Sequence, residues 1–280
     1  MKKISRRSFL AASGLTIAAL ALTACGGSAS TASSAAASSV AASSEAASTS
    51  AAAAELTTVE AGKLTMATNA AFPPYEMTTD AGAFEGIDID TAQAIADKLG
   101  LELQIDDMDF DAALLSVQQG KADIAMAGVT VTDERKNVMD FSDSYATGIQ
   151  SIIVPEGSDI ASPDDLAGKK IGTQRGTTGY LYCSDDFGDD AVVAYDSGLT
   201  AVQALNNGQV DAVVIDNEPA KAYVESNPGL KILDTSYAEE DYAIGMAKGS
   251  SLEAAVNAAL EELKADGTLQ AIVDKYITAE

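Results

Sequence analysis

Apolar and polar positions alternate along residues 56–280 in short blocks that predict β-strands and α-helices in turn. The block 63–68 is a compact apolar strand, and apolar side chains recur at helical spacing over 91–99. This half predicts the strand 63–68, a helix capped by Asp90 and ended by Gly100, the strand 101–105, a helix capped by Asp111 and ended by Gly120, and the strand 122–127. Strands that alternate with helices are typical of a parallel α/β sheet.

The second half of the chain repeats this order of elements. It predicts a short helix begun by Ser162 and Pro163, the strand 170–174, the helix 200–207 and the strand 210–215. The segments 117–128 and 205–216 both run from a helix end through a glycine, two residues and an aspartate into an apolar strand. The repeat makes Gly128 and Asp216 equivalent and predicts two related, doubly wound α/β lobes.

A ligand site is expected where the strands of both lobes end. In open α/β sheets, ligands bind outside the carboxyl ends of the strands, where loops and helix N-termini collect. Four segments end predicted strands in this way: 69–75, 128–135, 174–178 and 216–218. We therefore expect the cleft between the lobes to be lined by these segments.

The first 24 residues have the pattern of an export signal. Lys2, Lys3, Arg6 and Arg7 precede an apolar run that ends at Ala24, and this run is too short for a membrane-spanning helix. Leu22-Thr23-Ala24-Cys25 resembles the lipobox of bacterial lipoproteins, which predicts lipidation of Cys25. A plain signal peptide with a chance cysteine is the alternative, and the arginine pair leaves open whether export follows the general or the twin-arginine route.

Composition predicts a tether after this signal. Residues 26–54 are Gly, Ser, Ala and Thr except for Val40 and Glu45, too few apolar groups to offset chain entropy, so this tract is expected to be disordered. A lipidated cysteine and linker over 25–55 would carry the folded body above a membrane. The net charge of −25 argues against nucleic acid and anionic lipid as partners.

Two residue types restrict the possible chemistry. The chain has no histidine, which excludes Ser-His-Asp and Cys-His catalysis and removes the usual zinc ligand. Of its two cysteines, Cys183 forms no disulfide if Cys25 is lipidated, and a buried packing role is the expected one. We expect no metal and no cofactor.

Arginine placement gives the first candidate for ligand binding. Beyond the signal the chain has only Arg135 and Arg175, and both lie in segments that end strands. A guanidinium binds a carboxylate with two parallel hydrogen bonds, and Gly128 and Thr130 just upstream offer close backbone approach and a hydroxyl donor. This combination suits the α-carboxylate of an amino acid, although a surface charge is the ordinary role of an arginine.

Asp216 and several aromatic residues complete the candidate set. A carboxylate at the end of the repeated strand suits an ammonium group, while capping of the helix that follows is an equal and compatible role for Asp216. Phe72 and Tyr75 flank Pro73-Pro74, an unusual place for core residues, and their rings could enclose an aliphatic stem. For Phe110, core packing is the competing interpretation.

These motifs together resemble one family over residues 60–278: the polar amino-acid substrate-binding proteins of ABC importers, solute-binding family 3, in their lipoprotein form. The similar segments are Gly86-Ile87-Asp88-Ile89-Asp90, Ala127-Gly128-Val129-Thr130 followed by Arg135, Gly176-Thr177-Thr178-Gly179, and the strand leading to Asp216. The resemblance implies a ligand site formed by Asn69, Phe72, Tyr75, Phe110, Ala127, Gly128, Thr130, Arg135, Gln174, Arg175, Thr177, Thr178 and Asp216. Asn69 stands where several relatives carry aspartate, which weakens an anchor for a cationic group, and Arg175 contacts either the ligand or the rim of the cleft.

The resemblance also implies an architecture and partners. It implies a type II periplasmic-binding-protein clamp with two crossing strands near 146–150 and 241–245, so that lobe 1 holds 56–146 and 244–280 and lobe 2 holds 147–243. The expected protein is a monomer, lipid-anchored on the outer face of a cell membrane, that captures a polar amino acid and delivers it to an ABC permease.

Two alternatives use the same fold. A few relatives are exported dehydratases of the cyclohexadienyl or arogenate type, which need a general acid such as Glu76 or Glu218, but the complete set of amino-acid contacts argues against an enzyme. A ligand-sensing module for a separate receptor is the other alternative. The identity of the amino acid and the type of cell envelope stay open.

Overall fold

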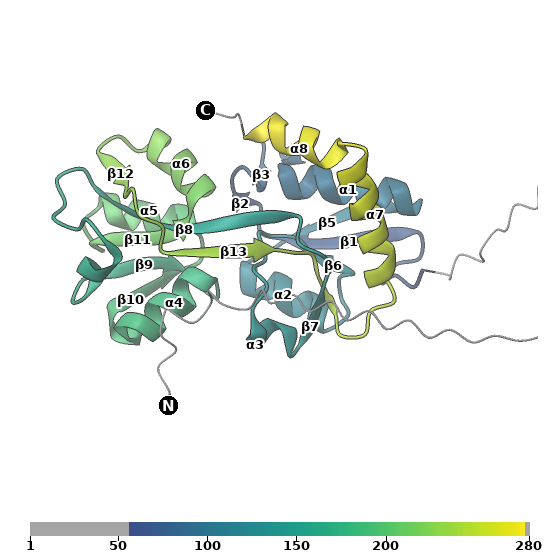
Figure 1. Cartoon of the computed structure of the whole chain (residues 1–280), viewed down its shortest axis with the longest axis horizontal. Coiled ribbons are helices and arrows are strands. Elements are labelled where there is room, and N and C mark those ends of the chain that lie inside the picture. The colour runs from purple at the N-terminus through teal and green to yellow at the C-terminus, as the bar shows by residue number, and fades with distance from the viewer. Residues whose placement is uncertain (1–55, 278–280) are drawn as a thin grey trace, which may run out of the picture. The chain divides into compact units, whose positions relative to one another are not determined.

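A computed structural model describes residues 56–277, which contain two separate main sheets (Figure 1). The expected signal peptide, Cys25 and linker lie outside the described residues. Within 56–277 no helix is both long enough and apolar enough to cross a bilayer.

The first main sheet has five strands in the order β5-β1-β6-β14-β7. Strand β1 pairs in parallel with β5 and β6, whereas β14 pairs antiparallel with β6 and β7. The strands are β1 (Lys63–Thr68), β5 (Glu102–Asp107), β6 (Ile124–Ala125), β7 (Met139–Phe141) and β14 (Gly245–Ala247). The helices of this lobe are α1 (Ile87–Leu99), α2 (Phe110–Gln118), α3 (Asp133–Lys136), α7 (Glu253–Ala265) and α8 (Thr268–Tyr276).

A small sheet in the order β2-β3-β4 adjoins α1 in the same lobe. Its strands are β2 (Ala71–Phe72), β3 (Glu76–Thr78) and β4 (Phe84–Glu85), and the peptide bond between Pro73 and Pro74 in the β2–β3 turn is cis. This hairpin places residues 69–76 beside the carboxyl end of β1.

The second main sheet has the order β10-β9-β11-β8-β12, with β13 paired to β8. Its strands are β8 (Ala146–Pro155), β9 (Ile171–Gln174), β10 (Val192–Tyr195), β11 (Ala212–Asp216), β12 (Leu230–Ile232) and β13 (Ala238–Tyr242). Its α-helices are α4 (Thr178–Phe187), α5 (Gly198–Asn206) and α6 (Asn217–Ser226), with 3-10 turns η1 (Pro163–Leu166) and η2 (Asp189–Ala191).

Two strands carry the chain between the lobes. Strand β8 leaves the first lobe after β7, and β13 returns to it before β14, and the two pair antiparallel from Ala146↔Tyr242 to Gln150↔Ala238 (Figure 1). Helices α7 and α8 then pack against α1, so the C-terminal helices belong to the first lobe.

Each main sheet buries apolar side chains on both faces. In the first sheet, Leu64 and Met66 pack toward α1 and α7, while Ala67 and Met139 pack toward α2. Successive strand residues point to opposite faces, which explains why β1 reads as a continuous apolar run. In the second sheet the same alternation separates a cluster under α5 and α6 from one under α4 that includes buried Cys183.

Several element boundaries differ from the sequence prediction. Helix α1 begins at Ile87, not after a cap at Asp90, because the amides of Ile87 and Asp88 donate to the carbonyls of Pro74 and Tyr75. Asp90 instead pairs with Lys275. Helix α2 begins at Phe110 with Asp109 at the N-cap, and Asp111 lies inside its first turn. Gly100 ends α1 in the left-handed conformation, as predicted.

The start of α1 depends on a glycine. Gly86 has φ 134° and ψ 174°, a region that only glycine adopts readily, and a Cβ there would lie 2.1 Å from the carbonyl oxygen of Tyr75. This close approach allows the Pro74 and Tyr75 carbonyls to reach the first amides of α1.

Gly86→Ala is expected to lower the free energy of unfolding by about 3 kcal/mol, since it adds both a forbidden backbone conformation and a clash. Urea unfolding of the protein measures this change. Gly82→Ala is the control, because Gly82 has φ 78° with no atom within 4 Å of an added Cβ; it should cost about 1 kcal/mol. Equal losses in the two variants would contradict the role assigned to Gly86.

Candidate functional site

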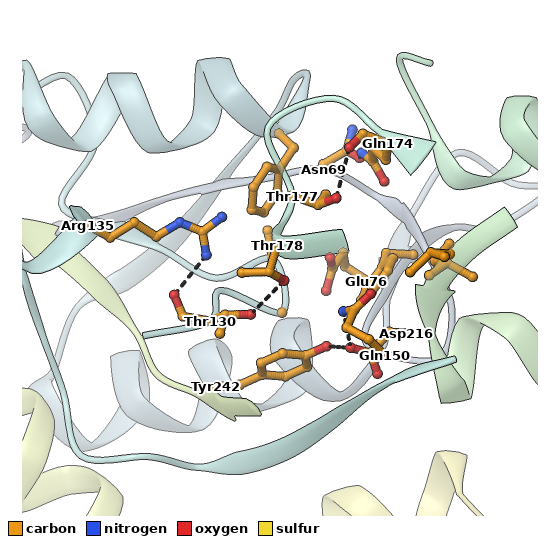
Figure 2. A pocket seen from close by; sticks show the side chains of 16 residues that line it. Asn69, Glu76, Thr130, Arg135, Gln150, Gln174, Thr177, Thr178, Asp216 and Tyr242 are labelled. Carbon is orange, nitrogen blue, oxygen red and sulfur yellow. Dashed lines mark hydrogen bonds between the residues drawn. The ribbon is translucent and has the colours of Figure 1, made fainter. Parts of the chain in front are cut away.

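A cavity lies between the two lobes and is lined by residues of both. Both lobes line it where their strands end, and Tyr242 at the end of the crossing strand β13 lies on its wall (Figure 2). The lining residues are Asn69, Phe72, Glu76, Phe110, Ala127, Gly128, Thr130, Arg135, Gln150, Gln174, Thr177, Thr178, Val214, Ile215, Asp216 and Tyr242.

Arg135 provides the positive charge of the cavity. It lies in α3, is 8% exposed, and donates through Nη1 to the Thr130 carbonyl at 2.7 Å and through Nη2 to the Gly176 carbonyl at 3.2 Å. Its Cζ atom lies 5.3 Å from the centroid of the Phe110 ring. In the described part of the chain no ion pair neutralises this guanidinium. Burial lowers the pKa of Arg135, but an arginine stays charged in proteins.

Two threonines from opposite lobes lie beside Arg135. Thr130 Oγ1 and Thr178 Oγ1 are 3.4 Å apart, and Thr178 is the first residue of α4. Thr177 caps this helix by accepting from the amide of Tyr180. The N-terminus of a helix favours negative charge. Hydroxyls, helix N-terminus and guanidinium together form a region suited to a carboxylate.

Asp216 lies on the other side of the cavity, at the end of β11. Its carboxylate accepts from the Tyr242 hydroxyl and, at 3.2 Å, from Gln150 Nε2. Burial raises the pKa of Asp216 to about 7, the Glu240 carboxylate adds to this rise, and the Tyr242 hydroxyl opposes it. Asp216 also occupies the N-cap position of α6, but its side chain makes no capping hydrogen bond.

Glu76 gives the cavity another carboxylate. It is fully buried, and no donor of the described chain reaches either of its oxygens. Asp88, also fully buried, lies next to it and accepts from the Gly128 amide at 3.0 Å and the Tyr145 hydroxyl at 2.7 Å. Burial and the nearby Asp88 raise the pKa of Glu76 well above its usual range.

Glu240 connects the two lobes beside the cavity. This residue of β13 is 6% exposed, and its Oε2 accepts from Thr130 Oγ1 and from Gln150 Nε2, both at 3.0 Å. Glu240 therefore links the first-lobe threonine to a glutamine of β8 that also holds Asp216.

The aromatic candidates separate into two groups. Phe72 and Phe110 line the cavity, and Phe110 also packs in the core beside Ala113. Tyr75 does not line it: the ring is 3% exposed and packs between Phe72, at 5.8 Å, and Tyr242, at 5.4 Å. Tyr75 therefore supports the wall from behind.

The uncharged polar candidates Asn69 and Gln174 contact each other across the lobes, whereas the side chain of Arg175 does not line the cavity. Gln174 Nε2 donates to Asn69 Oδ1 at 2.9 Å, and Asn69 Nδ2 donates to the Met108 carbonyl. The side chain of Arg175 is 57% exposed and lies 3.7 Å from Asp196. The structure thus gathers eleven of the candidates named from the sequence around one cavity, Asn69, Phe72, Phe110, Ala127, Gly128, Thr130, Arg135, Gln174, Thr177, Thr178 and Asp216, and leaves Tyr75 and Arg175 off its wall.

The family of bacterial extracellular solute-binding proteins, family 3, matches residues 64–279. The chain belongs to this family. A probable histidine-binding protein of Neisseria gonorrhoeae is 33% identical over 222 residues, which cover 77% of this chain and 83% of that protein. The arginine-, lysine-, histidine-binding protein ArtJ of Geobacillus stearothermophilus is 34% identical, with a TM-score of 0.75 over 78% of this chain and 96% of that one.

A further solved structure is an ancestral arginine-binding protein bound to glutamine. It is 43% identical, with a TM-score of 0.74 over 78% of this chain and 99% of that one. These matches confirm the family resemblance and the two-lobe, type II binding-protein fold expected from the sequence. The relatives are binding proteins, so this solute-binding protein is not an enzyme, and the dehydratase alternative is not favoured.

Sequence reasoning missed Glu76, Gln150, Val214, Ile215 and Tyr242 as lining residues of this solute-binding protein. Glu76 directly follows a segment that was singled out, but was considered only as an enzymatic acid. Gln150 and Tyr242 lie on the crossing strands β8 and β13, whose pairing brings them together from distant parts of the chain. No local sequence signal marks either of them.

Tyr242→Phe is expected to raise the pKa of Asp216 above about 7, because it removes the hydroxyl that stabilises the carboxylate. Carbon-detected NMR titration of the Asp216 carboxyl measures this value. Tyr237→Phe is the control, since its hydroxyl donates to the surface residue Asp186. An unchanged Asp216 titration in Tyr242→Phe would contradict the assigned contact.

Proposed function

We propose that this protein captures a free amino acid with a cationic side chain, of the arginine type, and delivers it to an ABC permease. The observation that carries the proposal is the separation of basic and acidic groups across one cavity: a buried guanidinium at one side and the buried carboxyl groups of Asp216 and Glu76 at the other (Figure 2). Such an arrangement complements a ligand that is itself negative at one end and positive elsewhere.

The backbone of the amino acid fits the groups nearest Arg135 and Asp216. Its α-carboxylate would accept from Arg135, from the hydroxyls of Thr130 and Thr178, and from the N-terminus of α4. Its α-ammonium would donate to Asp216, which Gln150 and Tyr242 hold in place. These groups exist in every free amino acid, so they fix the ligand class without selecting a side chain.

The side chain of the ligand would extend toward Glu76. An unpartnered, fully buried carboxyl group costs free energy unless a hydrogen-bond partner satisfies it, and a guanidinium supplies up to five N–H donors. Phe72 and Phe110 line the same cavity and offer apolar surface to an aliphatic stem. Relatives described as binding arginine, lysine or histidine support this choice.

Capture would use closure of the lobes about β8 and β13. Direct contacts already join the lobes across the cavity: Thr130 with Thr178, and Asn69 with Gln174. Outside it, the Tyr223 hydroxyl donates to the Ala71 carbonyl. A ligand held by groups of both lobes adds to these contacts and stabilises the closed form.

Delivery requires a membrane partner and a means of staying near it. Family membership supports an ABC permease as the partner. We further propose that the protein acts as a monomer and that lipid on Cys25 anchors it to the outer face of the membrane through the linker that follows.

A thermal-unfolding screen against the common amino acids tests ligand capture. Arginine is expected to give a large stabilisation, about 2.7 kcal/mol at 100 times its dissociation constant. Arg135→Ala should weaken binding about 100-fold or more, because it removes a buried, bidentate partner. Arg175→Ala is the matched control and should bind as the unaltered protein does. No stabilisation by any amino acid, or equal effects of the two variants, would contradict the proposal.

Membrane fractionation of cells that express the full chain tests the anchor. The unaltered protein should partition into the detergent phase of a Triton X-114 extract, and Cys25→Ser should move it to the aqueous phase, because the acyl chains are lost. Cys183→Ser is the control, since Cys183 is buried in the second lobe. Detergent-phase partition that survives Cys25→Ser would contradict lipidation at this residue.

A further inference from the structure

We propose that Glu76 exchanges its proton for the positive charge of the ligand, so that pH sets the preference of this site between cationic and neutral ligands of one shape. The inference rests on the proposed function, because it assigns a protonation change to the group that would receive the ligand side chain.

The distribution of donors carries the argument. Two adjacent carboxyl groups, Glu76 and Asp88, are both fully buried, but their surroundings differ. Asp88 accepts from the Gly128 amide and the Tyr145 hydroxyl, whereas no donor of the described chain reaches the oxygens of Glu76. Hydrogen bonds stabilise the ionised form, and burial without them favours the neutral form. Burial raises the pKa of Asp88 to about 6 against the lowering effect of its hydrogen bonds, whereas the pKa of Glu76 is raised well above its usual range, so near neutral pH Asp88 is the anion of the pair and Glu76 carries the proton.

The other carboxyl groups that face Glu76 also raise its pKa. Asp107 at the end of β5 and Asp216 at the end of β11 both raise its pKa by repulsion. The remaining titratable neighbours are the hydroxyls of Tyr75, Tyr145 and Tyr223, whose own pKa values are raised by burial. Among the described residues that line the cavity, the basic group is Arg135, which lies across the cavity from Glu76 (Figure 2).

The proton balance differs between two ligands of nearly equal shape. When arginine binds, the Glu76 carboxyl releases its proton to solvent, and the resulting carboxylate pairs with the guanidinium. When citrulline binds, its neutral ureido group has a carbonyl oxygen in place of one nitrogen, so Glu76 keeps its proton and donates to that oxygen. The net charge at this position is therefore zero in the ligand-free protein, in the arginine complex and in the citrulline complex.

Calorimetric titration of the protein with L-arginine and L-citrulline between pH 5.5 and 8 tests the inference. The ratio of the arginine affinity to the citrulline affinity should rise about tenfold per pH unit between the pKa of Glu76 in the arginine complex and its higher pKa in the citrulline complex, and level off above the latter. Titrations in buffers of different ionisation enthalpy should show that arginine releases about one proton more than citrulline. Asp216 contacts the α-ammonium of both ligands, so its own titration cancels in the ratio.

Glu76→Gln should make the affinity ratio independent of pH, and Glu102→Gln, at an exposed position on β5, should leave it pH-dependent. A wild-type ratio that does not change with pH, with equal proton release for both ligands, overturns the inference and leaves the proposed function standing. Binding of other amino acids but of neither arginine nor citrulline also overturns it. Failure of every amino acid to bind overturns the proposed function itself.

Discussion

The cost of burying charge in one cavity is the constraint on which this structure depends. Arg135, Asp216, Glu76 and Glu240 are almost completely removed from solvent, and no donor of the described chain reaches either carboxyl oxygen of Glu76 or Oε1 of Glu240. An isolated buried charge is costly unless it is paired and hydrogen-bonded, or neutralised by a proton. A zwitterionic ligand supplies the missing charges, which explains why a binding protein can keep an arrangement that would otherwise only reduce its stability.

The fold forms this arrangement from common α/β elements. Parallel strands of both lobes end at the cavity and deliver Thr130, Thr178 and Asp216 to it from separate elements. The crossing strands β8 and β13 add Gln150 and Tyr242, which fix the carboxylate of Asp216. The same strands connect the lobes, so closure and completion of the site use one structural element.

Some residues of the site can be predicted from local sequence patterns, whereas others come together only through tertiary contacts. Arg135 could be predicted because it is one of only two arginines beyond the signal and lies in a segment that ends a strand, and Asp216 because it ends a strand of the repeated pattern. Tyr242 and the cross-lobe role of Glu240 could not, since both depend on the pairing of β13 with β8 over about ninety residues of chain. The helix cap predicted at Asp90 was also wrong, because backbone carbonyls accept from the first amides of α1 in place of a side-chain cap.

A crystal structure of the protein with bound L-arginine tests the central claim most directly. The account predicts the α-carboxylate on Arg135, the α-ammonium within hydrogen-bonding distance of Asp216, and the guanidinium against Glu76. An amino acid bound in the reverse direction, or with its side chain directed away from Glu76, would contradict the complementarity of charge on which the account is built.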